Sequence, residues 1–128
     1  MQTKSNEVIL MLMPKPSKFD PIRGWGNGYL IIPIDHPAVT YWATEENIDL
    51  PKVIKNVWGD GLFGQYMQLP EMEQEITYTK YENWNDQDYI RIGFDTAHIY
   101  NNQEHDYSYV LRETLKLKAI VDSYMGDN

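Results

Sequence analysis

The chain contains no cysteine, which excludes disulfide bonds, thiolate metal sites and cysteine nucleophiles. It also lacks a long apolar run: the one near the start, Val8 to Met13, stops at Pro14, whereas a membrane helix needs about 18 or more residues. That run is not followed by a small-residue cleavage site. The sequence therefore predicts a soluble, cytoplasmic protein with no membrane partner.

Basic residues are few, with eleven Lys and Arg against nineteen Asp and Glu, and the formal net charge is -8. A protein that tracks nucleic-acid phosphates needs a basic stripe, so we expect no direct nucleic-acid binding. The acidity is local, because residues 71–106 hold nine acidic side chains and only two basic ones. This acidic run predicts either a solvated sheet face or a surface that imitates nucleic acid.

Length and composition indicate one globular domain over residues 1–128, since the chain is 42% hydrophobic and too short for two cores. Strand patterns cover residues 29–34, 73–82 and 89–94, and residues 8–13 fit either a buried strand or a short entry segment. A glycine-rich loop at 24–28 precedes the second strand, which we expect to be buried on both faces. The turn between the last two strands is predicted at 83–88. In the last strand Ile90, Ile92 and Phe94 share the core face.

Two helices are predicted. Residues 49–59 form a short amphipathic pattern, followed by a loop at 60–70, and residues 106–125 form a long one. The long helix carries an apolar stripe of Val110, Leu117, Ile120 and Val121, with Glu113 among the polar residues elsewhere on the helix. These elements predict an α+β fold, a small antiparallel sheet with one long C-terminal amphipathic helix packed on one face.

Polar residues stand at two strand ends. Asp95 and His98 follow one strand, and Asp35 and His36 follow another, so the two pairs converge if their strands are neighbours. A metal ion would need three or four ligands, for which His36, Asp95 and His98 are available, with His105 in reserve. The simpler interpretation is that Asp95 accepts N–H groups of a turn and that the histidines are packed.

Catalytic motifs are missing, since no His-Glu-x-x-His and no Gly-x-Ser-x-Gly pattern occurs. The sequence therefore favours a protein that is not an enzyme and assigns no cofactor. Ten tyrosines and four tryptophans are many for this length. They serve either as core and rim or as flat faces for a ligand or an interface.

Residues 27–125 resemble a family of small, mostly unassigned proteins of tailed phages and prophages. The resemblance rests on five segments: 27–33, the His36-Pro37 pair, 76–78, 92–98 with its Gly-Phe-Asp-Thr-Ala-His run, and the helix containing Glu113, Thr114 and Leu117. Residues 1–26 lie outside the resemblance, as an N-terminal extension or edge segment. The resemblance implies phage origin, an accessory role and residence in the cytoplasm of the infected bacterium.

Three functions remain open. The first is a noncatalytic counter-defence protein that sequesters a small nucleotide-like signal in a pocket between protomers of a homo-oligomer. Aromatic rings would stack on the base, Arg91 would meet phosphate, and Asp95 or Thr96 would bond base edges or ribose hydroxyls. The expected ligand-binding residues are Tyr29, His36, Arg91, Asp95, Thr96 and His98.

The second function is an acidic inhibitor that binds a host protein through residues 71–106. The third is a small metal-dependent hydrolase, in which a metal ion held by His36, Asp95 and His98 lowers the pKa of a bound water.

Overall fold

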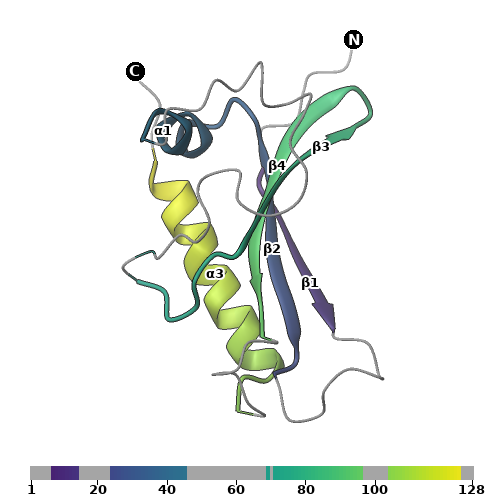
Figure 1. Cartoon of the computed structure of the whole chain (residues 1–128), viewed down its shortest axis with the longest axis vertical. Coiled ribbons are helices and arrows are strands. Elements are labelled where there is room, and N and C mark those ends of the chain that lie inside the picture. Colours follow the sequence, from purple (N-terminus) through teal and green to yellow (C-terminus); the bar gives the residue numbers. More distant parts are fainter. Residues whose placement is uncertain (1–6, 15–23, 46–68, 70, 97–103, 125–128) are drawn as a thin grey trace.

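The computed structural model of the chain describes residues 7–14, 24–45, 69, 71–96 and 104–124. In this part of the chain, four strands form one antiparallel sheet in the order β1-β2-β4-β3, and two helices accompany it (Figure 1). The elements in chain order are β1 (Ile9–Pro14), β2 (Gly26–Pro33), α1 (Pro37–Glu45), β3 (Tyr78–Trp84), β4 (Gln87–Asp95) and α3 (Tyr107–Ser123). The predicted α+β fold, with the long C-terminal helix on the sheet, is confirmed.

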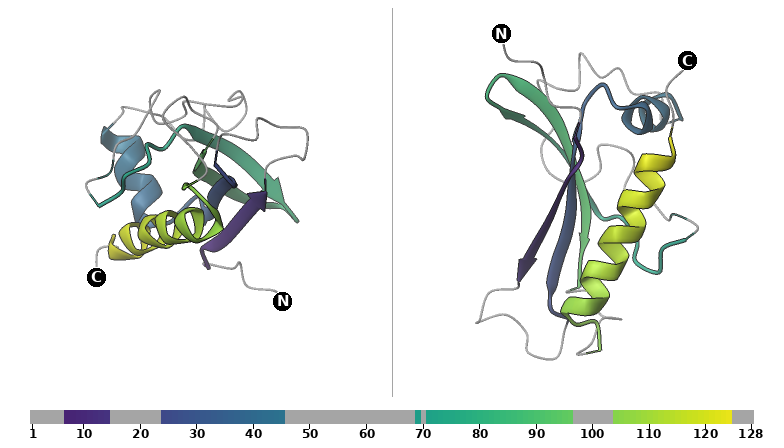
Figure 2. Two further views of the ribbon diagram at one scale, coloured as in Figure 1. Left: turned by 90° about the horizontal axis from the view of Figure 1, so that it is seen from below. Right: turned by 180° about the vertical axis from the view of Figure 1, so that it is seen from behind.

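One face of the sheet packs against α3, as the views in Figure 2 show. Side chains alternate along each strand, so Leu30 on β2 and Ile92 on β4, which are register partners, point to the same face. We call this the helix face. Its apolar side chains join those of α3 in one buried core that includes Leu30, Ile32, Ile90, Ile92, Phe94, Val110, Leu117 and Val121. The predicted burial of the last strand against the last helix is thus confirmed for Val110, Leu117 and Val121, whereas Ile120 is only partly buried.

The glycines at the start of β2 belong to the strand and not to the predicted loop. Gly28 lies at a close approach of α3 to the sheet, because a Cβ at this position would collide with the Thr114 hydroxyl and press on the Phe94 ring. The sequence predicted a loop here whose glycines allow positive φ or close backbone approach; in the strand, Gly28 allows close packing of helix and strand.

The turn between β3 and β4 is tighter than predicted, since only Asn85 and Asp86 connect the strands. Both residues have positive φ, 52° and 63°, as a two-residue hairpin turn requires. Asn and Asp tolerate this conformation better than other side chains that carry a Cβ. The strand predicted at 73–82 begins later, at Tyr78, and continues to Trp84.

Sequence reasoning missed α1, which follows β2 after a short turn. Pro37 occupies its first position, where the missing N–H costs nothing. Its inner side buries Ala38, Val39, Trp42 and Ala43. The Trp42 ring meets Tyr124, just beyond α3, at a centroid distance of 5.7 Å, so α1 is joined to the end of α3. The helix predicted at 49–59 lies outside the described residues.

Within the described part of the chain, neither helix is long and apolar enough to cross a membrane.

Candidate functional site

The second face of the sheet, opposite α3, is rich in aromatic and charged side chains, and we call it the aromatic face. Register pairs place these residues on it: Asn27, Tyr29, Tyr78, Lys80, Glu82, Trp84, Tyr89, Arg91 and Asp95. Three of the six expected binding residues, Tyr29, Arg91 and Asp95, therefore share one surface.

Tyr29 lies across its register partner Gly93. A Cβ on Gly93 would come within 2.5 Å of Tyr29 Cδ1, so the glycine makes the space that the ring occupies. The Arg91 guanidinium carbon stands 5.3 Å from the centre of the same ring, within the range of a cation–π contact. Tyr78 meets the ring edge-on at 5.4 Å. The Asn27 side-chain amide donates to the Tyr29 hydroxyl at 2.8 Å. The Tyr29 ring is therefore fixed by this hydrogen bond at its hydroxyl and by the packing of its neighbours around the ring.

Arg91 is also paired with a carboxylate. Its Nε lies 2.6 Å from Glu82 Oε2, and its Nη2 donates to Glu82 Oε1 at 3.1 Å. The Trp84 indole N–H donates to the same Oε1 at 3.0 Å. The Arg91 and Glu82 side chains are 18% and 15% exposed, so the pair is partly accessible from solvent. An anion that approaches Arg91 must compete with Glu82 for a fork of N–H donors that suits carboxylate or phosphate.

Asp95 ends β4 and Thr96 follows it, beside the start of β2. The Thr96 hydroxyl donates to the Gly26 carbonyl at 2.7 Å and accepts from the Gly26 N–H at 3.0 Å. Thr96 is buried, and its carbonyl accepts from Gly24 N–H at 2.8 Å. It therefore fastens two backbone segments together. Asp95 is half-buried opposite Asn27 on the aromatic face.

His36 lies at the other end of the sheet. The strands before His36 and Asp95, β2 and β4, are neighbours as expected, but they pair antiparallel. Asn27 faces Asp95 while Pro33 faces Tyr89, so six residue steps, roughly 20 Å, separate the two ends. The expected convergence of His36 with Asp95 is therefore wrong, and the three-ligand metal site fails with it.

The remaining histidines give no metal site either. His98 lies outside the described residues. His105 packs its ring on Tyr109 at 4.5 Å. Across residues 7–14, 24–45, 69, 71–96 and 104–124, no three His, Asp or Glu side chains are grouped so as to hold a metal ion.

The role that the structure gives His36 is a helix cap. Its Nδ1 accepts the Ala38 N–H at 3.0 Å, and its carbonyl accepts the Thr40 N–H at 3.1 Å, which opens α1. Partial burial lowers the pKa of His36 below the usual 6.5, and Asp122 and Asp35 oppose that shift. Pro33, Asp35, His36 and Pro37 line a surface hollow here.

The acidic run does not form one surface. Glu82 pairs with Arg91, Asp88 accepts from the Tyr81 hydroxyl at 2.6 Å, and Asp106 caps α3 by accepting the Tyr109 N–H at 3.0 Å. The exposed members are spread over the molecule: Glu71 and Glu73 lie beside α3, Asp86 lies at the hairpin turn, and Glu104 and Asp106 lie ahead of α3.

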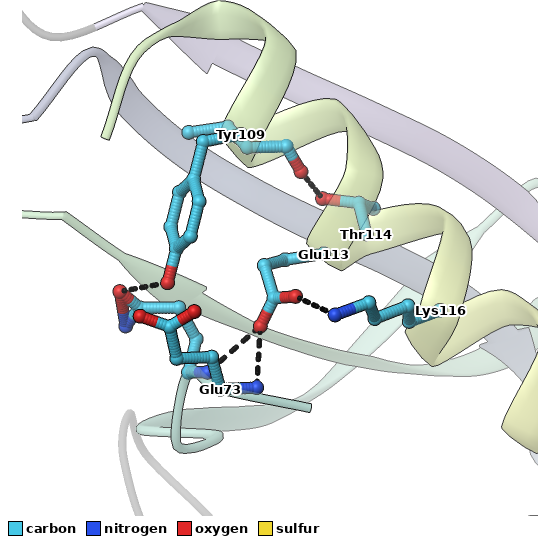
Figure 3. A network of polar contacts seen from close by, with 7 residues as sticks. Glu73, Tyr109, Glu113, Thr114 and Lys116 are labelled. Atoms are coloured by element: carbon cyan, nitrogen blue, oxygen red, sulfur yellow. Dashed lines mark hydrogen bonds and ion pairs between the residues drawn. The ribbon is translucent and has the colours of Figure 1, made fainter. Parts of the chain in front are cut away.

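A buried polar network beside α3 was missed by sequence reasoning. Glu113, expected on the polar side of the helix, is fully buried (Figure 3). Its Oε1 accepts the backbone N–H groups of Glu73 and Gln74 at 2.7 and 2.8 Å, and its Oε2 lies 2.8 Å from Lys116 Nζ. The Tyr109 hydroxyl donates to Gln74 Oε1 at 3.3 Å. This network fastens the segment that leads into β3 onto α3.

No protein-family model matches the chain, and neither the curated proteins nor the solved structures contain a match.

Proposed function

We propose that the protein is a noncatalytic binding protein that takes a small nucleotide-like ligand on the aromatic face, around Arg91. The observation that carries the proposal is the Arg91 guanidinium, which is set against the Tyr29 ring and paired with the partly exposed Glu82 carboxylate. The resemblance to phage and prophage proteins supports a biological role for this binding, namely that the protein sequesters a signalling nucleotide during infection.

Each side chain has a distinct role in this proposal. Tyr29 is buried and supports Arg91 from beneath, whereas Tyr78 and Trp84 are half-buried and offer ring surface to a base. Arg91 binds the phosphate through two N–H groups, and Glu82 moves aside. Asp95, half-buried on the same face, accepts from a sugar hydroxyl or a base amino group. His36 and Thr96 are left out of this binding set, because His36 is at the far end and the Thr96 hydroxyl bonds Gly26.

Two features decide how such a site would work. The chain carries a net charge of -8, so a phosphate is repelled at long range and must gain its affinity from short contacts. Glu82 neutralises Arg91 while no ligand is bound, which keeps a partly buried charge paired. Glu82 therefore occupies, while no ligand is bound, the place beside Arg91 that the ligand's anionic group takes on binding. The acidic inhibitor has less support, since the exposed acids are dispersed.

Calorimetry against mononucleotides, dinucleotides and cyclic nucleotides tests the proposal. Arg91→Ala is expected to abolish binding, and Glu82→Gln is expected to tighten it about tenfold, because the neutral amide competes less well for the guanidinium. Lys118→Ala is the matched control, as Lys118 forms an exposed pair with Asp122 on α3 and its loss should leave binding unchanged. If neither the wild type nor Glu82→Gln binds any of these nucleotides, the proposal is overturned.

A further inference from the structure

The strand β1 forms one edge of the sheet, and its composition is unusual for an edge. In the part of the chain that the structure describes, only β2 pairs with it. An edge strand exposes a row of backbone N–H and C=O groups, and soluble proteins commonly protect such edges with charged residues. The opposite edge, β3, carries Lys80 and Glu82, whereas β1 reads Ile-Leu-Met-Leu-Met-Pro and has no charge.

Exposed apolar side chains on β1 are placed symmetrically. Ile9 is 36% exposed and Met13 43% exposed, and both belong to the face opposite α3. Each lies two residues from Met11. An antiparallel two-fold axis through Met11 would therefore set Ile9 of one copy against Met13 of the other, twice. In the same register, Leu10 of one copy lies opposite Leu12 of the other on the helix face. Apolar side chains therefore meet apolar side chains on both faces of the joined strands.

A second apolar surface lies on the same side of the molecule. Glu113 faces the segment leading into β3, and Leu111 and Leu115 are each two residues away, about 200° around the helix. They thus point to the side of β1, beside which α3 runs in Figure 2. Leu115 is 48% exposed. Leu111, Leu115 and Ala119 border a hollow of about 450 Å³ on this helix, whose other lining residues are Ser108, Arg112 and Lys116.

From these observations we infer that the protein forms a two-fold dimer in which β1 of one copy pairs antiparallel with β1 of a second copy, with Met11 at the axis. The joined sheet has eight strands. Both copies of α3 lie over the same face of that sheet, each with its Leu111 and Leu115 side toward the other. A second copy fits better than a charged peptide, because β1 is uncharged and complementary to itself. The inference does not depend on the proposed ligand.

Cysteine cross-linking tests the position of the axis, and the absence of natural cysteine leaves a clean background. In Met11→Cys the two thiols face each other, with Cα atoms about 4.5 to 5.5 Å apart, within disulfide range. We expect a covalent dimer on mild oxidation. The matched control is Met13→Cys, which is more exposed but lies roughly 13 Å from its copy, so it should remain uncrosslinked. Equal cross-linking of both variants would contradict the register.

Charge exchange tests the pairing itself, through sedimentation velocity over a range of protein concentrations. Ile9→Lys and Met13→Glu should each raise the dimer dissociation constant about tenfold or more, since each places an unpaired charge on the strand. The double variant carries both changes and should restore association, because opposite charges then meet across the axis. Circular dichroism checks that each variant is folded.

A monomer at every concentration up to about 0.5 mM would overturn the inference. So would a dimer that both single variants leave intact, since its interface would then lie elsewhere.

Discussion

The two ends of the sheet are fastened by different chemistry. At the end where β2 begins, Thr96, Gly24 and Gly26 hold one another through backbone bonds and one hydroxyl. At the end where β2 finishes, the chain enters α1 through the imidazole of His36. We call these the Thr96 end and the His36 end. No bond in the first group involves a titratable side chain, whereas the cap at the second depends on a group whose charge changes near neutral pH.

Core packing near the Thr96 end should give the largest effect. Phe94 is fully buried, and Phe94→Ala should lower the free energy of unfolding by about 3 to 5 kcal/mol. The measurement is urea unfolding followed by circular dichroism. Tyr41→Ala at the His36 end is the control: Tyr41 is exposed and its ring meets that of Tyr124 at a centroid distance of 5.2 Å, so its loss should cost about 1 kcal/mol or less. A loss under about 1 kcal/mol for Phe94→Ala would show that this end is not the tightly packed one.

The close approach of α3 to β2 should give an intermediate effect. Gly28→Ala forces a Cβ into the Thr114 hydroxyl and should cost about 1 to 3 kcal/mol. Thr114→Ala removes the colliding atom, so the double variant should be more stable than the sum of the two single losses predicts. Strict additivity in the same urea measurements would mean that helix and strand have room to separate.

Protonation of His36 should give the smallest effect, and only at its own end. The folded state lowers the pKa of His36 below 6.5, so the unfolded chain binds this proton more readily. The stability from the cap is therefore complete above about pH 6.5 and is lost as the pH falls below that value. About 1 kcal/mol is expected, as for other helix caps. Hydrogen exchange at the Ala38 amide measures the loss locally.

His36→Asn supplies the control, because asparagine also accepts the Ala38 N–H but does not titrate. The stability advantage of the wild type over the variant should decrease from pH 7.5 to pH 5.5. Comparing the two proteins at each pH cancels the contributions of the other two histidines, which both proteins contain. A difference that stays constant with pH would contradict the role given to the Nδ1 lone pair.

Sequence patterns predicted those elements whose own periodicity was strong. β4 and α3 were placed because Ile90, Ile92 and Phe94 alternate and because Val110, Leu117 and Val121 recur at helical spacing. The helix α1 was missed because His36 is not a usual cap. Tyr41 and Trp42, moreover, belong to residue types that favour strands.

The candidate site shows which features local sequence patterns do not predict. Tyr29, Arg91 and Asp95 share a face because of the register between β2 and β4, but the same antiparallel register moved His36 to the far end. A strand's direction relative to its neighbour is a property of the sheet and not of either strand. Glu113 was misjudged for a similar reason, since the N–H groups that justify its burial belong to Glu73 and Gln74, about 40 positions earlier in the chain.

The Glu113 network also bears on the order in which the molecule is made. Residues 73–74 leave the ribosome well before their carboxylate partner does, and α3 is the last described element to be synthesised. Until α3 has been made, the backbone N–H of Gln74 lacks its acceptor on Glu113, and the helix faces of β1 and β2 are not covered by the helix. Such a chain completes this core only after α3 has been made, and the apolar strand β1, the first described element, waits longest for the helix that packs beside it. Partly made chains are consequently those most exposed to strand-to-strand aggregation.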